Sequence, residues 1–203
     1  MVKQERAVRT RASVMSAAAA AFQREGYDRS SLARISKASG MSVGAVTFHF
    51  SSKEELANAV DRKGRSVTLT TVEQACAEPG TALRRLIGLT LHLARLMEED
   101  PWVSAAIRLA RERPQVPAWS AVWLPTVNEL LDLASENGEL RAGTPVGDVA
   151  TLVEHLTAGA EVHVMYHRTD DDHESAVERM ARLWCLILRG FSVDPSGVEP
   201  VTD

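Results

Sequence analysis

The chain has 203 residues, of which 45% are hydrophobic and 25% are charged, and its formal net charge at pH 7 is −4. This composition predicts a packed globular protein, with one sizeable core or a small head joined to a body. No apolar run is long enough to cross a bilayer, and the N-terminus is charged and alanine-rich rather than a signal peptide. We therefore expect a cytoplasmic protein that makes no membrane contact.

Charge is divided unevenly along the chain. Residues 1–65 contain 12 Lys and Arg against 6 Asp and Glu, a net charge of +6, so the remaining residues carry a net charge of −10. A basic head on an acidic body favours contact with nucleic-acid phosphates over a uniform enzyme surface. Arg9 and Arg11 lie where they could reach a DNA backbone or minor groove, and a solvated basic tail is the alternative.

The first helix is predicted over residues 7–25, because apolar and small side chains recur there at helical spacing and Gly26 is expected to end it. Ser31 to Phe50 then predicts a helix-turn-helix, with a left-handed turn at Gly40 between two short helical patterns. Ser42 is placed to cap the second helix and Val46 to point back at the first. An ordinary helical hairpin with a glycine turn is the alternative.

In a helix-turn-helix the second helix enters the major groove, and hydroxyl groups on it can contact bases or phosphates. Lys53 follows that helix and is expected to meet a phosphate. The residues that we expect to contact DNA are Arg9, Arg11, Ser31, Ser42, Val43, Gly44, Ala45, Thr47, Phe48, His49 and Lys53.

The run Ser51-Ser52-Lys53-Glu54-Glu55 offers two overlapping capping boxes, Ser51 with Glu54 or Ser52 with Glu55, for a connecting helix over 52–76. Glycine and proline divide the remainder into helices expected over 83–98, 101–113, 118–135, 146–168 and 172–190. No alternating strand pattern, nucleotide-binding loop or serine-elbow motif occurs, so we expect an all-α protein that needs no cofactor and is not an enzyme.

Two possible site residues have simpler structural explanations. His163 and His167 share a helical face at a spacing that zinc can use, but no third ligand is fixed by the spacing, and polar residues at a helix end are the preferred interpretation. No metal site is predicted. Cys76 and Cys185 lie far apart without CxxC spacing, which predicts free thiols rather than a disulfide.

Trp102, Trp119 and Trp123 fall within 22 residues of one another in a chain poor in aromatic residues. Three indoles suit a pocket for a small, mostly apolar molecule, and packing in the core is the alternative for each. The helices expected over 146–168 and 172–190 are apolar over most of their circumference. They predict a two-fold four-helix interface between two copies of the chain, with burial in a monomer core as the alternative.

Taken as a set, part of the N-terminal sequence resembles the signature of TetR-family repressors. The resemblance rests on Arg11, Ala17-Ala18, Phe22, Gly26-Tyr27, Ser31-Leu32, Ile35, Gly40 to Val46, Phe48-His49-Phe50, Lys53-Glu54 and Leu56. It implies an all-helical homodimer in which three N-terminal helices bind DNA and about six more bind a ligand and dimerise. The domains are then expected at 1–51 and 52–193, with a disordered tail at 194–203.

Within that family, the Phe48-His49-Phe50 ending, the Arg108-Leu109 region and the pattern from Trp123 through Leu130-Leu131 to Gly138-Glu139-Leu140 resemble the γ-butyrolactone receptors of actinomycetes. This resemblance implies a ligand-stacking Trp123, with Trp119 second and Leu86, Thr90 and Val127 as candidate walls. Thr47 departs from the family, because most relatives carry a phosphate-contacting tyrosine there. It resembles the pseudo-receptor variant, whose members respond to antibiotics or their intermediates as well as, or instead of, butyrolactones.

The expected function is a ligand-responsive repressor that binds a palindromic operator as a homodimer and is released by a small signalling molecule. The alternatives are a pseudo-receptor, and a helical enzyme or scaffold in which the hairpin is incidental.

Overall fold

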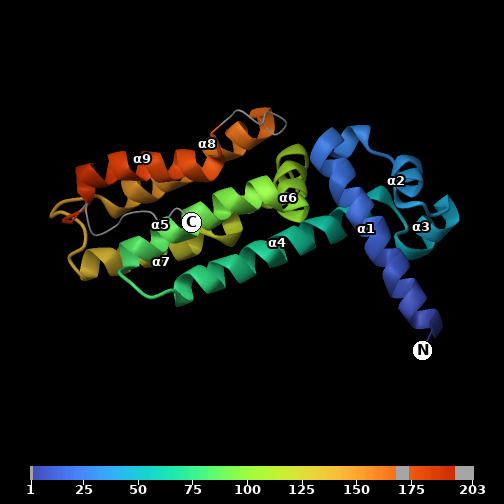
Figure 1. Ribbon diagram of the computed structural model, residues 1–203, viewed down its shortest axis with the longest axis horizontal. Helices are drawn as coiled ribbons and strands as arrows, with labels where there is room; N and C mark the ends of the chain where they lie inside the picture. The colour runs from blue at the N-terminus through green and yellow to red at the C-terminus, as the bar shows by residue number, and fades with distance from the viewer. Residues whose placement is uncertain (1, 168–173, 195–203) are drawn as a thin grey trace. The chain divides into compact units, whose positions relative to one another are not determined.

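A computed structural model gives the structure of residues 2–167 and 174–194, and within these residues the chain is built from α-helices and one short 3₁₀ helix (Figure 1). The only β-type pairing among them is an isolated antiparallel bridge between Leu140 and Ser192. The predicted all-α fold is confirmed. The elements are α1 (Val2–Arg29), α2 (Leu32–Ser39), α3 (Val43–His49), α4 (Lys53–Ala77), α5 (Ala82–Glu99), α6 (Pro101–Glu112), η1 (Trp119–Val122), α7 (Leu124–Glu136), α8 (Val146–His167) and α9 (Ala176–Phe191).

The chain forms two compact units, and α4 contributes to both. The first unit combines residues up to 67 with 100–119, and the second combines 68–99 with the described residues from 120 onward. This grouping differs from the sequence-based boundary between residues 51 and 52. The reason is that α6 packs against α1, so a segment far along the chain joins the N-terminal helices.

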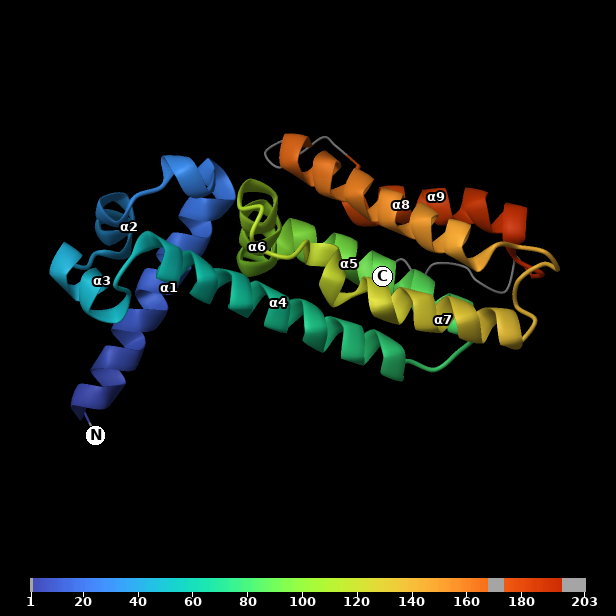
Figure 2. The same cartoon turned by 180° about the vertical axis from the view of Figure 1, so that it is seen from behind.

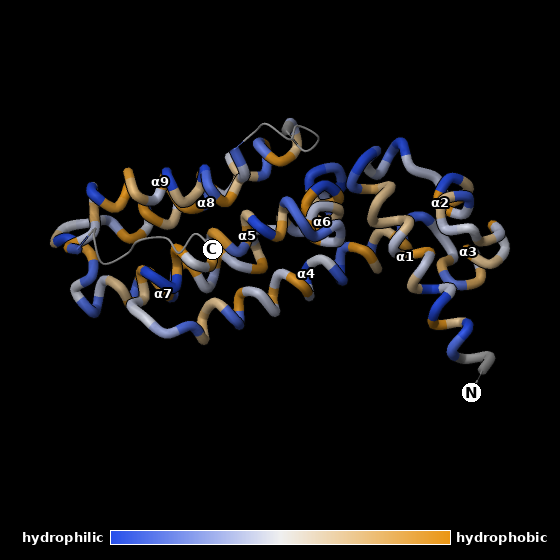
Figure 3. Tube along the Cα trace, in the orientation of Figure 1, coloured by the Kyte–Doolittle hydropathy of each residue, from blue (hydrophilic) through white to orange (hydrophobic). Residues whose placement is uncertain are grey.

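The second unit is a helical bundle in which α5 packs against α7, α8 and α9, and α7 packs against α8 (Figure 2). Hydrophobic positions recur along these helices (Figure 3), and on α5 they include Leu86, Leu89 and Leu93, which are fully buried. Inside this bundle the indole Nε1 of Trp184 donates a hydrogen bond to the hydroxyl of Thr90 at 2.8 Å. That hydroxyl donates in turn to the carbonyl oxygen of Ile87 at 2.7 Å.

Two predicted helix boundaries are wrong for local reasons. The helix expected over 118–135 is divided into η1 and α7. Pro125 has no N–H to donate within a continuous helix, and its ring would clash with the carbonyl group four residues earlier. Pro125 instead occupies the first turn of α7, where proline is favoured. The last helix begins at Ala176 rather than 172, because Ser175 and Glu178 form a reciprocal capping box there. Residue 172 itself lies outside the described residues.

The start of α4 forms half of the predicted box of Ser52 with Glu55, and the Glu55 carboxylate turns to Ser51 instead of Ser52. The Ser52 hydroxyl accepts from the backbone N–H of Glu55 at 3.0 Å, whereas the Glu55 carboxylate accepts from the N–H and the hydroxyl of Ser51, both at 2.7 Å. These hydrogen bonds from Ser51 hold the pKa of the Glu55 carboxyl below its usual value. None of the helices described is both long enough and apolar enough to span a bilayer.

The buried Trp184–Thr90 pair gives a test of the second unit. Trp184→Phe removes the indole donor, and we expect it to lower the free energy of unfolding by about 1–3 kcal/mol, because it loses a buried hydrogen bond. Urea unfolding at one fixed protein concentration measures this change. Thr90→Val removes the same bond from the other side, so the double variant should lose clearly less than the sum of the two. Additive losses would show that the two side chains are not coupled.

Candidate nucleic-acid interface

The turn between α2 and α3 is fixed by hydrogen bonds within a few residues. Gly40 takes a left-handed conformation with φ 69° and ψ 16°, as predicted. The Ser36 hydroxyl donates to the carbonyl of Met41 at 2.6 Å across the turn, and the Ser42 hydroxyl accepts from the N–H of Ala45 at 3.1 Å at the start of α3. Ser31 caps α2 in the same way, by accepting from the N–H of Arg34.

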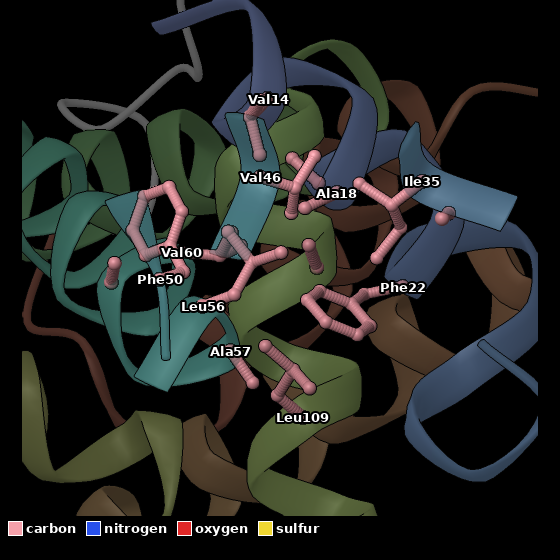
Figure 4. Close-up of a cluster of buried hydrophobic side chains, with 14 residues drawn as sticks. Val14, Ala18, Phe22, Ile35, Val46, Phe50, Leu56, Ala57, Val60 and Leu109 are labelled. Atoms are coloured by element: carbon pink, nitrogen blue, oxygen red, sulfur yellow. The ribbon is translucent and has the colours of Figure 1, made fainter. Parts of the chain in front are cut away.

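The inner face of this hairpin is held by one apolar cluster (Figure 4). Val46 of α3 and Ile35 of α2 are fully buried, and Phe22 of α1 and Leu109 of α6 belong to the same cluster. The predicted role of Val46 in locking the crossing of the two helices is therefore confirmed. Burial of Val46 also fixes which side of α3 faces outward, because residues on the opposite side of the helix from Val46 must point away from the cluster.

The outward face of α3 is small and largely hydrocarbon. Val43 is 49% exposed and Phe48 is 83% exposed, and Gly44 and Thr47 are exposed between them. The Thr47 hydroxyl donates to the carbonyl of Gly44 at 3.2 Å within the helix. Ser42 is exposed, whereas Ala45 and His49 are half-buried at the edges of this face.

Basic side chains are exposed near this face on α1. Arg6 and Arg9 are exposed, and Arg11 places its guanidinium 4.9 Å from the centre of the Phe50 ring. Phe50 directly follows α3, so a cation–π contact holds Arg11 beside the end of this helix. Charge and shape together suit a surface that meets a phosphate backbone on either side of a groove.

Lys53 has partners within the protein. Its ammonium group donates to the carbonyl oxygens of Tyr27 at 2.9 Å and Ser30 at 3.2 Å, and lies 4.1 Å from the centre of the Tyr27 ring. Two of its three protons are therefore donated to backbone carbonyls, one in the last turn of α1 and one just beyond it. The structure gives Lys53 a role in joining α4 to α1, and its contact with a phosphate stays a prediction.

Contacts from α6 to the end of α1 were missed by sequence reasoning. Arg108 donates to the carbonyls of Gln23 at 3.0 Å and Arg24 at 2.8 Å, and the Glu112 carboxylate accepts from the N–H of Tyr27. Between them Gly26 breaks the helix with φ 81°, as predicted for the end of the first helix. The spacing of Arg108 and Glu112 indicates a pair on one helical face, but nothing local identifies partners about 85 residues away.

A second close contact joins α6 to α4. A Cβ atom added to Gly64 would lie 2.4 Å from the carbonyl oxygen of Trp102, which is far inside van der Waals contact. Glycine inside a helix costs about 1 kcal/mol relative to alanine, and here close packing of two backbones offsets that cost.

The predicted pocket residues are all buried. Leu86, Thr90, Trp123 and Val127 are at most 1% exposed, and Trp119 is 3% exposed. Thr90 uses its hydroxyl in the hydrogen bonds to Trp184 and Ile87 described above. One cavity of about 180 Å³ in the second unit is lined by Thr81, Leu83, Gly138, Glu139, Ser192, Val193 and Asp194, and by none of the five predicted residues.

His163 does not act as a free ligand. Its Nε2 lies 2.8 Å from the carbonyl oxygen of Glu174, and its Nδ1 lies 3.5 Å from Arg179. The side chain of His167, and His173, fall outside the residues that the structure describes. Among the described residues, no three His, Cys, Asp or Glu side chains converge as metal ligands would.

An exposed helix-turn-helix within an all-helical chain defines a DNA-binding transcriptional regulator. Residues 14–60 match the family model of bacterial regulatory proteins of the tetR family. The chain is 32% identical over 93% of its length to a TetR regulator from Streptomyces fradiae, TylP, whose structure it matches over 89% with a TM-score of 0.62. The chain belongs to the TetR family.

Two further comparisons define its nearer relatives. A γ-butyrolactone receptor of the ArpA-like type matches with a TM-score of 0.77 and 26% identity, over 93% of this chain and 90% of the receptor. The A-factor receptor protein of Streptomyces griseus is 32% identical over 142 residues, 69% of this chain. That alignment spans 49%, or about half, of the A-factor receptor. The chain is a TetR-family regulator related to γ-butyrolactone receptors.

Lys53 allows the structural and phosphate roles to be separated. We expect Lys53→Ala to lower the midpoint of thermal unfolding, because two carbonyls lose their donor, and to change the salt dependence of DNA binding little. Arg9→Ala is the matched control, because Arg9 is exposed. It should leave the unfolding midpoint unchanged and reduce the slope of log K against log[salt] by about one. An unchanged midpoint with a reduced slope for Lys53→Ala would restore the phosphate role.

Proposed function

We propose that the protein is a ligand-responsive repressor that binds a palindromic operator as a homodimer and is released by a small signalling molecule of the γ-butyrolactone type. The observation that carries the proposal is the exposed, capped α3 on a basic head, in a chain related to γ-butyrolactone receptors. A DNA-binding regulator of this kind acts in the cytoplasm.

The dimer is supported by an uncharged exposed stripe on α8. Val162, Met165 and Tyr166 are 43%, 53% and 73% exposed, and Ala158 and Gly159 extend the same side of the helix. A contiguous exposed apolar surface of this kind indicates an interaction site. A Cβ atom at Gly159 would meet no neighbour within 4 Å, so the fold itself does not require glycine there. Close approach of a helix from a second copy would require a small residue at this position.

The last helix supplies the other half of the proposed interface. Leu186 of α9 is 68% exposed, and Cys185 beside it is also exposed. In a two-fold dimer the same patch serves both subunits. The two recognition helices would then lie about 34 Å apart, one turn of duplex, or a multiple of it, and a near-palindromic operator follows from this symmetry.

Release follows from a difference in affinity. An effector that prefers a state with another separation of the recognition helices lowers operator affinity only by its differential affinity for the two states. Helix α4 begins directly after the reading head, which consists of α1, α2 and α3, and it continues into the second unit. We propose that α4 transmits the change in separation of the recognition helices. A pseudo-receptor that responds to an antibiotic or its intermediate is the second candidate, and Thr47 is the residue that favours it.

The test is selection of duplexes from a random library by the purified protein, repeated with a synthetic γ-butyrolactone and with an actinomycete culture extract. An enriched near-palindrome released by the lactone would support the proposal, and release by the extract alone would favour the pseudo-receptor. A non-repeating site would argue against the homodimer. Absence of enrichment would overturn the repressor function.

The pocket assignment has its own prediction. Trp123→Phe keeps most of the buried volume, so we expect operator affinity to stay within about twofold, while the effector concentration needed for release rises about tenfold because the larger indole surface is lost. Competition binding with labelled operator measures both. Met180→Leu, a volume-conserving change at a buried residue of α9, is the control. If both variants shift the release equally, the pocket does not involve Trp123.

A further inference from the structure

The recognition helix lacks the side chains that usually read bases. Residues 42–50 include no Arg, Lys, Asn, Gln, Asp or Glu, which are the residues that make paired hydrogen bonds to base edges. The hydroxyl proton of Thr47 is already donated to the carbonyl of Gly44. The direct hydrogen-bonding capacity of this face is therefore small.

What the face does offer is hydrocarbon. Val43 and Phe48 are 49% and 83% exposed, and the Thr47 side chain adds a methyl group between them. Positions 43 and 47, and 44 and 48, are each one turn apart, so the four residues form one continuous surface. The group in the major groove that such a surface contacts favourably is the 5-methyl of thymine.

Gly44 supplies an independent observation. It lies in the first turn of a seven-residue helix, where glycine is less favourable than alanine by at most about 1 kcal/mol. A Cβ atom added there would meet no atom of the protein within 4 Å, so no packing contact in the fold calls for glycine. An external surface that comes within contact distance of the backbone accounts for it, and a DNA base edge is the surface presented to this face in a helix-turn-helix.

We propose that this protein reads its operator mainly through thymine methyl groups, which Phe48 and Val43 contact while Gly44 lets the helix backbone approach the bases. This proposal rests on one part of the proposed function, the specific binding of an operator by the protein. Exposed arginines on α1, Arg6 and Arg9, would supply affinity for phosphates without carrying sequence information.

The test uses the duplex enriched by selection, synthesised with thymine or with deoxyuridine, which keeps the same base pairing and lacks only the methyl group. Replacing one contacted thymine in each of the two half-sites should weaken binding about sixteenfold, because each buried methyl contributes roughly fourfold. Replacing thymines outside the half-sites is the control. Equal affinity for the thymine and deoxyuridine operators would overturn the proposal while leaving the repressor function intact.

Protein variants separate methyl contact from general damage to the head. Phe48→Ala should bind the thymine operator at least tenfold more weakly and bind both operators about equally. Val193→Ala, which removes an apolar side chain that is 60% exposed in the second unit, should retain the full preference for thymine. A Phe48→Ala variant that keeps the preference would assign the methyl contact elsewhere and overturn this role.

Gly44→Ala is expected to change stability and operator binding in opposite directions. Alanine should raise the midpoint of thermal unfolding by about 2 °C through helix propensity. It should also weaken operator binding at least tenfold, because the added methyl holds the bases away. Unchanged operator binding by a stabilised variant would contradict the close approach, and a lowered midpoint would show that the fold itself needs the glycine.

Discussion

The position of the reading head depends on the hydrogen bonds that the carbonyl groups at the end of α1 accept. Where Gly26 breaks that helix, carbonyl groups near its end accept hydrogen bonds from side chains of later segments. Arg108 donates to two of them, and Lys53 donates to the carbonyls of Tyr27 and Ser30 just beyond. Both cations also complement the negative end of a helix dipole. Because α2 and α3 follow immediately, these contacts set where the hairpin starts.

This arrangement makes α6 a structural part of the DNA-binding unit. Its close approach to α4 at Gly64 and its hydrogen bonds to α1 tie together three segments that are distant in sequence. Helix α4 contributes residues to both compact units, whereas α6 belongs to the first. The DNA-binding unit therefore includes residues that no motif in its own sequence reveals.

Sequence sufficed wherever the interaction was local. The left-handed Gly40, the Ser42 cap and the buried Val46 follow from spacing within one or two turns, and the structure has each of them. Sequence could not reveal partners that come from far along the chain. The Lys53 ammonium donates to carbonyls on a segment more than twenty residues earlier, and the Thr90 hydroxyl accepts from a tryptophan 94 residues away.

The two cysteines differ in a way that makes the native chain its own reporter. Burial raises the pKa of the Cys76 thiol, and nearby Arg85 opposes this effect only in part, so little of the reactive thiolate forms. Cys185 is exposed and lies beside Leu186 on the α9 surface proposed for dimerisation. A thiol reagent should therefore modify a free subunit at Cys185 and an assembled one slowly. In a dimer formed through this surface, the rate of alkylation at this single atom would measure dissociation into subunits without any added label or substitution.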